Sequence, residues 1–331
     1  DWPAAKVTLS IPMGEVAART SQDIAKARAA ADFAPERIEE VLRDSRIDND
    51  SRKKVMNTLA KDPIFGNWKK RMIHMNREQQ MRQSHFACRR LLELAEKHEW
   101  TTHEVVEAAL TLDLQSPITI HWVAFVPVIF GQGNAEQIER WGNKAMNHEI
   151  MGCYMQTELA HGSNLSALRT TATFDHNSDE WIINTPEPSA GKVWIGGSGL
   201  TATYGVVMAN LIISEKSYGM HPFLVHLRSL EDHTLLPGRR IIEMGCKLGA
   251  PAMDNGYTCF DSVRIPRSHL LQRFARQVRA SQVQPQRGAL AVQFLLTLVG
   301  LLRQQRLGVR EVGQRVAPAA QLARAGAELD G

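Results

Sequence analysis

The spacing of apolar residues changes near residue 150, and this change constrains the fold more than any other feature of the sequence. Before it, apolar residues recur every three or four positions, the period of an amphipathic helix. After it, short apolar runs alternate with glycine, proline and polar turn residues, as in β-strands. The chain has 331 residues, enough for two hydrophobic cores. We therefore expect a helical domain over residues 1–150 and a β-domain over residues 151–275.

The first domain carries recognisable helix starts. Pro35 precedes apolar residues at helical spacing, as a proline in a first turn does. Thr101 with Glu104, and Asn134 with Gln137, match the capping-box pattern. Over residues 80–98 we expect one apolar helix face, made of Met81, His85, Cys88, Leu91, Leu92 and Ala95.

The second domain contains short strands separated by turns. Residues 170–183 predict a hairpin, because two β-forming runs flank the polar residues 175–179. Residues 206–213 and 223–227 predict buried strands, and residues 256–263 predict another, ended by Pro266. Such short, punctuated strands favour a compact antiparallel barrel or sandwich over a parallel α/β sheet.

The composition changes again after residue 275. From Gln277 onward the chain contains no lysine, and residues 289–302 predict one helix that is too short to cross a bilayer. We expect residues 276–331 to form a divergent helical or disordered tail. One interpretation is an ordinary terminal helix with a loose end. The other is a shifted reading frame or alternative exon, which the abrupt change favours.

Several classes of function are excluded by composition. The net charge of +4 is too mild to indicate nucleic-acid binding. The 4 cysteines form no C-x-x-C pair, so neither a disulfide framework nor a zinc site is expected. No apolar window is long enough for a membrane span. His221, His226 and His233 lack the spacing of a metal motif, and no metal is expected.

Two stretches could hold a flat polar ligand. In the first, residues 151–164, a Thr157-Glu158 pair precedes a Gly-Ser-Asn turn, which can offer amides and a hydroxyl to a ring with several acceptors. In the second, residues 192–203, three glycines beside Trp194 would let the backbone approach such a ring closely. A plain polar turn and a hairpin turn are the alternatives.

A third stretch, residues 254–267, is less specific. Asn255-Gly256 is a strong turn signal between β-forming residues. The residues alone predict only a hairpin that closes a barrel.

Taken together, the three stretches resemble the acyl-CoA oxidase family in order and spacing. Residues 153–173 resemble the family's signature around a Thr-Glu pair. Residues 192–200 resemble its aromatic-Pro-Gly-Gly segment, with Ile195 in place of the usual proline. Residues 218–223 resemble its Gly-x-His-x-Phe run, and residues 62–65 resemble part of its helical domain. The resemblance covers roughly residues 30–275.

The resemblance implies an α+β multidomain, peroxisomal-type, FAD-dependent enzyme. An N-terminal helical domain would precede a β-barrel or sandwich middle domain, with only a remnant of the C-terminal helical domain. Thr157 and Gly196 would contact the flavin, and Trp194 would lie near its ring. The implied reaction is desaturation of acyl-CoA to trans-2-enoyl-CoA in fatty acid β-oxidation, with molecular oxygen as acceptor and hydrogen peroxide as product. The implied partner is a second copy of the chain.

The resemblance assigns no catalytic residue in this sequence. The family's base is a glutamate of the C-terminal helical domain, and the sequence leaves the family pattern near Arg276. Glu158 is an acid beside the flavin loop, but the family does not use it as the base. A non-catalytic isoform that binds flavin or acyl-CoA is therefore the alternative function. The family implies a peroxisomal location, although residues 328–331 are not an S-K-L signal.

Overall fold

The computed structural model describes residues 13–42, 49–68, 72–113, 116, 118–273, 275–279 and 282–285. Contacts divide the chain into one unit that ends at Ser51 and another that begins at Arg52. The first unit contains α1 (Met13–Ala29) and α2 (Pro35–Leu42), and Pro35 is the first residue of α2 as predicted. The helix predicted over residues 289–302 lies outside the described residues.

The helices that lead into the β-strands are of two kinds. The long ones are α3 (Asn49–Lys61), α5 (Arg77–Lys97) and α6 (Thr102–Thr111). A run of short pieces follows: α7 (Ile118–Ile120), a π-helical turn (His121–Phe125), α8 (Val126–Gln132), α9 (Ala135–Gln137), a second π-helical turn (Ile138–Gly142) and α10 (Asn143–Met146).

Both predicted capping boxes form. The side chains of Thr101 and Asn134 each accept a hydrogen bond from the backbone amide three residues later, and Asn76 caps α5 in the same way. The apolar face predicted over residues 80–98 is buried only in part. Met81, Cys88 and Leu91 are buried, but the stripe continues through Ser84, Ala87 and Leu94 instead of His85, Leu92 and Ala95. Neighbouring helices, which the spacing does not reveal, set this rotation.

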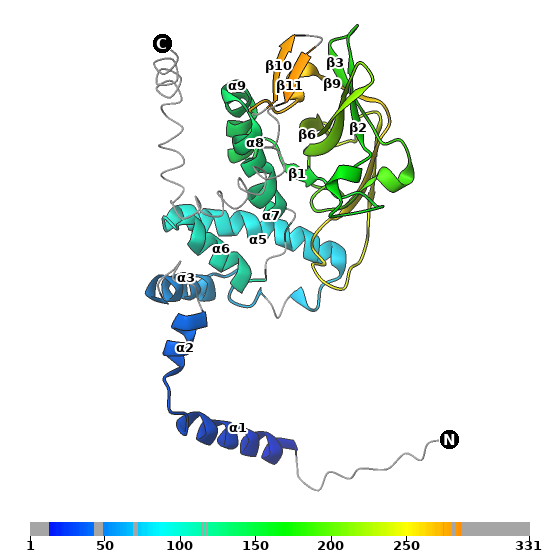
Figure 1. Ribbon diagram of the computed structural model, residues 1–331. Helices are drawn as coiled ribbons and strands as arrows, with labels where there is room; N and C mark the ends of the chain where they lie inside the picture. The colour runs from blue at the N-terminus through cyan, green and yellow to red at the C-terminus, as the bar shows by residue number, and fades with distance from the viewer. Residues whose placement is uncertain are drawn as a thin grey trace, which may run out of the picture. The chain divides into compact units, whose positions relative to one another are not determined.

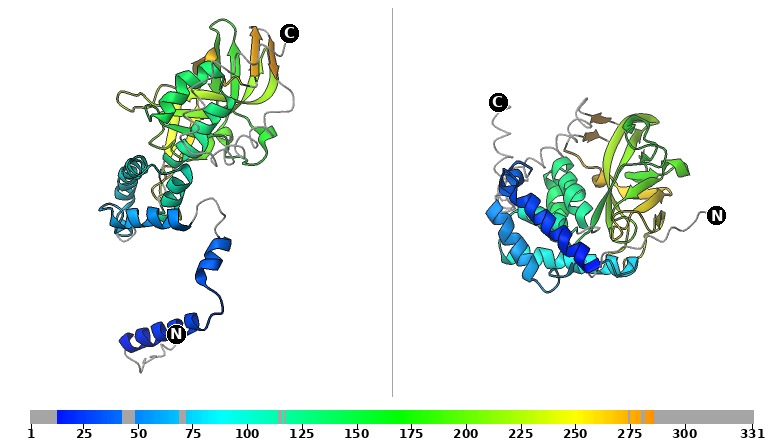
Figure 2. Two further views of the ribbon diagram at one scale, coloured as in Figure 1. Left: turned by 90° about the vertical axis from the view of Figure 1, so that its left-hand side faces the viewer. Right: turned by 90° about the horizontal axis from the view of Figure 1, so that it is seen from below.

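The largest sheet is built around β5 (Tyr204–Ile213). Its strands lie together beside α8 (Figure 1, with two further views in Figure 2). β6 (Lys216–His226) runs antiparallel along one edge of β5. The other edge is shared by β1 (Gly152–Met155), which pairs with Tyr204–Val207, and β2 (Thr171–Asp175), which pairs with Asn210–Ile212. The sheet continues through β3 (Glu180–Asn184) to β9 (Val263–Pro266).

Two smaller sheets complete the described strands. β4 (Lys192–Ile195) and β7 (Arg239–Glu243) flank β8 (Gly256–Phe260), with antiparallel pairing throughout. β10 (Ala275–Arg279) pairs with β11 (Gln282–Pro285). The helical region followed by a curled sheet confirms the predicted fold class, and the β2–β3 hairpin confirms the one predicted over residues 170–183.

Three details of the strand prediction were wrong. The sheet is mixed, because β1 and β2 both run parallel to β5. The strand predicted over residues 256–263 is two strands in different sheets, separated at Ser262, whose φ is 48°. Asn255-Gly256 is not a hairpin turn, since Gly256 already pairs with Glu243 at the start of β8. Apolar spacing shows neither strand direction nor the sheet to which a strand belongs.

Alternate residues of β5 pack into two different cores. Val207, Ala209 and Leu211 join a core inside the curled sheet, where Trp181 and Phe223 lie fully buried. Val206 and Met208 face the helices, where they belong to one core with Phe125, Ile129 and Trp141. Because β5 is buried on both faces, it joins the sheet to the helices, and each large side chain buried there contributes about 1.5–3 kcal/mol.

Candidate functional site

Thr157 and Trp194 belong to two backbone segments that lie side by side. After β1, the chain runs antiparallel to the start of β4, and Glu158 and Lys192 form a β-bridge. The amide of Val193 donates to the carbonyl of Thr157 at 3.0 Å, and the amide of Leu159 donates to the carbonyl of Gly191 at the same distance. The structure therefore brings together the first two stretches singled out in the sequence.

Trp194 has an unusual backbone and an exposed ring. Its φ is 60°, in the left-handed region that a bulky residue adopts only at a cost of about 1–3 kcal/mol. Its side chain is 58% exposed, while Val193 and Ile195 on either side are buried. The side-chain amide of Asn255 donates to the carbonyl of Trp194 at 2.9 Å. A large ring is thus exposed at the surface, and its backbone is bound by Asn255, the residue that precedes β8.

Gly196 lies at a close approach between the turn after β4 and the helices. A Cβ at this position would lie 2.8 Å from Cγ1 of Ile120 and 3.1 Å from Sδ of Met253. The next residue, Gly197, has a φ of 82°, which a side chain would disfavour. The glycines therefore let the turn pack against α7, next to the exposed ring of Trp194.

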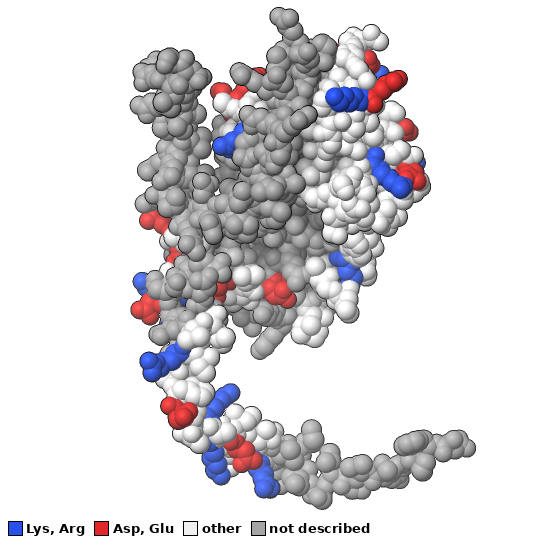
Figure 3. Space-filling view, in the orientation of Figure 1, with Lys and Arg blue, Asp and Glu red and all other residues white. Residues whose placement is uncertain are grey.

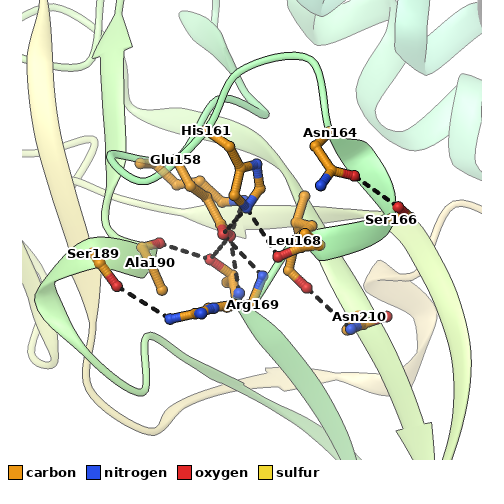
Figure 4. Close-up of polar contacts among 12 residues, drawn as sticks. Glu158, His161, Asn164, Ser166, Leu168, Arg169, Ser189, Ala190 and Asn210 are labelled. Atoms are coloured by element: carbon orange, nitrogen blue, oxygen red, sulfur yellow. Dashed lines mark hydrogen bonds and ion pairs between the residues drawn. The ribbon is translucent and has the colours of Figure 1, made fainter.

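Glu158 is fully buried and fully engaged in hydrogen bonds. Its Oε1 accepts from the amide and hydroxyl of Thr170 at 2.9 and 2.7 Å and from Nζ of Lys192 at 2.9 Å. Its Oε2 accepts from the amide of Arg169 at 2.8 Å, and His161 lies nearby (Figure 4). Burial alone would raise the pKa of Glu158, but Lys192 and these donors outweigh it and lower the pKa. These contacts give Glu158 a structural role rather than that of a base.

Lys192 is the positively charged partner of Glu158 in a buried ion pair. Its ammonium group is buried and also donates to the carbonyls of Gln156 at 3.2 Å and Met208 at 2.8 Å. Burial is the main cause that lowers the pKa of Lys192 to about 8. The ammonium thereby connects β5 to the residues on both sides of Thr157. The sequence alone pointed to no role for Lys192, because its only signal was a lysine in an apolar run.

His121 connects the π-helical turn to the start of β1. Its Nδ1 accepts from the amide of Gly152 at 3.0 Å, and its Nε2 donates to the carbonyl of Ala145 at 2.9 Å. The imidazole is therefore neutral, with its proton on Nε2. Burial is the main cause that lowers the pKa of His121 to about 4.

The histidines considered as metal ligands have other surroundings. His221 is buried in β6, His226 stacks on Tyr204 at 4.3 Å, and His233 hydrogen-bonds the carbonyl of Leu200. No three His, Cys, Asp or Glu side chains among the described residues are grouped so as to hold a metal ion. Nor does any helix in the described part of the chain have the length and apolar character to cross a membrane.

On the face drawn in Figure 3, the basic and acidic side chains of the described residues are interspersed. The two segments bring together a half-buried threonine, the exposed ring of Trp194 and a turn in which residues 196–199 are buried and Leu200 is exposed. This set fits a flat ring with several hydrogen-bond acceptors.

Comparison with known proteins gives a consistent result. Residues 34–151 match the family model for the acyl-coenzyme A oxidase N-terminal domain. The chain is 39% identical over 269 residues to peroxisomal acyl-coenzyme A oxidase 1 of Arabidopsis thaliana, a match that covers 79% of this chain and 40% of the relative.

Solved structures agree with this match. An acyl-CoA oxidase from tomato, Lycopersicon esculentum, is 33% identical with a TM-score of 0.75, over 83% of this chain and 42% of the other. Acyl-CoA oxidase-2 of Caenorhabditis elegans, bound with FAD, ascaroside-CoA and ATP, is 31% identical with a TM-score of 0.64, over 77% and 38%. The chain thus spans about 40% of the length of the Arabidopsis relative.

Proposed function

The chain belongs to the acyl-CoA oxidase family, and on this premise we propose that it binds FAD and an acyl-CoA thioester. The proposed reaction is the α,β-desaturation of acyl-CoA to trans-2-enoyl-CoA in fatty acid β-oxidation. Molecular oxygen would be the final electron acceptor and hydrogen peroxide the product. The C. elegans structure with FAD and ascaroside-CoA supports both ligand classes.

The observation that carries this proposal is the antiparallel contact between the Thr157 segment and β4. Since the amide of Val193 donates to the carbonyl of Thr157, the threonine and the ring of Trp194 are fixed in one local frame. We assign flavin contacts to Thr157, through its hydroxyl and amide, and to Gly196, through its backbone. Trp194 would line one side of the ring.

In the proposed reaction, the described residues position the flavin ring and shield it from water. When bound, FAD would supply the redox chemistry by accepting a hydride from the β-carbon of the substrate. The α-proton would pass to a carboxylate base, which the family resemblance places in the C-terminal helical domain and not among the described residues. Thr157 and the glycine turn orient the ring, and Trp194 excludes water from one side of it. Glu158 and Lys192 hold the backbone around Thr157 and do not exchange protons with substrate, because both are buried and paired.

The names of the relatives support a proposal for the location of the chain, and the family resemblance suggests its assembly. The Arabidopsis, guinea pig (Cavia porcellus) and mouse (Mus musculus) relatives are all named peroxisomal enzymes, and we propose a peroxisomal location for this chain. We also propose that it functions as a homodimer. Size-exclusion chromatography with light scattering tests the homodimer, and a fluorescent fusion in cells tests the location.

The visible spectrum of the purified chain tests the function. Titration with FAD should give saturable binding near one equivalent, with quenched flavin fluorescence. A long-chain acyl-CoA is then added without air. Bleaching of the flavin bands would support the oxidase reaction, whereas retention of flavin without bleaching would support the non-catalytic binding isoform. Absence of FAD binding would overturn the proposal.

A further inference from the structure

Arg228 binds the backbone of the turn that begins at Gly196. It follows β6, which ends at His226, and its side chain is only 4% exposed. Nη1 donates to the carbonyl of Ala202 at 2.7 Å, and Nη2 donates to the carbonyls of Ser198 and Gly199 at 2.9 and 2.8 Å. One planar guanidinium thus satisfies three carbonyls of a single turn, a geometry for which the flexible point charge of lysine is poorly suited.

Asp254 holds the amides of the same turn. Its side chain is fully buried, and its Oδ2 accepts from the amides of Leu200 and Thr201 at 2.8 and 2.7 Å. Its backbone carbonyl accepts from the amide of Gly199 at 3.0 Å. Arg228 therefore fixes the carbonyls and Asp254 fixes the amides, and the backbone has little freedom to change shape.

Burying the charges of Arg228 and Asp254 costs free energy, and apolar side chains could fill the same space without that cost. Two charged side chains are buried, and each binds the backbone of the turn instead of an oppositely charged side chain. Burying a charge is costly, and its hydrogen bonds offset only part of that cost. In addition, Oδ1 of Asp254 is buried and has no hydrogen-bond partner among the described residues. A buried polar atom without a partner calls for an explanation, and here the explanation is that Arg228 and Asp254 fix the shape of the turn.

The turn matters because of where it begins. It starts at Gly196, two residues after the exposed ring of Trp194, and ends at Ala202, two residues before β5 begins. The side chain of Asn255, next to Asp254, holds the carbonyl of Trp194. The residues around Asp254 thus hold both the tryptophan and the turn.

We infer that Arg228 and Asp254 are positioning residues that hold the turn Gly196–Ala202 in the shape needed to contact the flavin. This inference rests on the proposed function. Neither residue touches the flavin itself; both act through the backbone of the turn.

Arg228→Lys and Asp254→Ala test the inference in the full chain, with FAD as the probe. Each is expected to raise the FAD dissociation constant about tenfold, the equivalent of one strong hydrogen bond. Asp254→Asn keeps one oxygen that can accept both amides, so its affinity should stay within about threefold of the wild type. Arg239→Lys is the matched control, since Arg239 also donates to backbone carbonyls but not to those of the turn.

The spectrum of the bound flavin separates positioning from a general effect on folding. Circular dichroism in the visible bands should change in Arg228→Lys and Asp254→Ala at saturating FAD, and remain unchanged in Asp254→Asn and Arg239→Lys. If both altered variants bind FAD with the affinity and spectrum of the wild type, the inference is wrong.

Amide hydrogen exchange tests the inference with the wild-type chain alone, so the result does not depend on whether the variants fold. FAD should slow amide exchange in the peptide that covers residues 196–202. FAD binding without slower exchange in this peptide would overturn the inference while leaving the proposed function intact. If the wild type binds no FAD, the proposed function fails first.

Discussion

The backbone amide of Val193 donates a 3.0 Å hydrogen bond to the carbonyl oxygen of Thr157. The two segments proposed to contact the flavin therefore share one short antiparallel ladder. A change in either segment is transmitted to the other through the backbone, so substitutions here should affect ligand binding together with local order.

Thr157→Ala should weaken FAD binding by about twofold to tenfold, because the lost hydroxyl contributes the free energy of one hydrogen bond. The melting temperature should barely change, since the backbone bond to Val193 remains. Fluorescence titration measures the affinity. Thr157→Ser is the control and should bind nearly as tightly as the wild type. An alanine variant with unchanged affinity would remove Thr157 from the site.

Lys192→Met should destabilise the chain by about 3–5 kcal/mol, because it leaves the buried carboxylate of Glu158 without its counter-charge. The double variant with Glu158→Gln should lose less, since no buried charge is then left alone. Urea unfolding measures both. Arg82→Met is the control: it removes an exposed pair with Glu78 and should cost at most about 1 kcal/mol. Equal losses from Lys192→Met and Arg82→Met would contradict the structure.

Acid should destabilise the fold through His121. Its pKa is about 4 in the folded chain against an ordinary 6.5, so between these values the unfolded chain binds more protons. Stability should therefore fall as pH drops from 6.5 towards 4, by about 3 kcal/mol from this group, and the loss should level off below that range. Unfolding at several pH values measures the slope. In His121→Gln this part of the slope should disappear, and an unchanged slope would assign it to other groups.

Gly152→Ala should be strongly destabilising. An added Cβ would overlap the ring carbons of Phe125, which is fully buried and has no room to move. The expected cost is about 1–3 kcal/mol or more. Gly249→Ala should change stability by less than about 0.5 kcal/mol, because a Cβ added there would meet nothing within 4 Å beyond its chain neighbours. Thermal melting distinguishes the two, and similar melting temperatures would rule out the close packing of Gly152 on Phe125.

Local features were predictable from the sequence. The capping boxes at Thr101 and Asn134 and the β2–β3 hairpin depend on residues close together in the chain, and all are present. The proximity of the Thr157 and Trp194 segments was expected from the family resemblance rather than from spacing. The contacts of these residues with flavin remain predictions.

Long-range features were not predictable in this way. The Glu158–Lys192 pair joins residues 34 positions apart, and Arg228 reaches carbonyls 26 to 30 positions away. Apolar spacing gives no information on such partners, because it records only whether a side chain is buried. For the same reason it could not show that β8 and β9 belong to different sheets.

The shared edge of β5 has a consequence for how the chain folds. The β2–β3 and β5–β6 hairpins close short loops and can form early, whereas β1 must wait for the distant residues Tyr204–Val207 before it can pair. Closure of such long loops, between β1 and β5 and between β3 and β9, should limit the folding rate. During synthesis, β1 emerges first and stays without its partner until β5 has left the ribosome, and in that interval its unpaired edge is open to other chains.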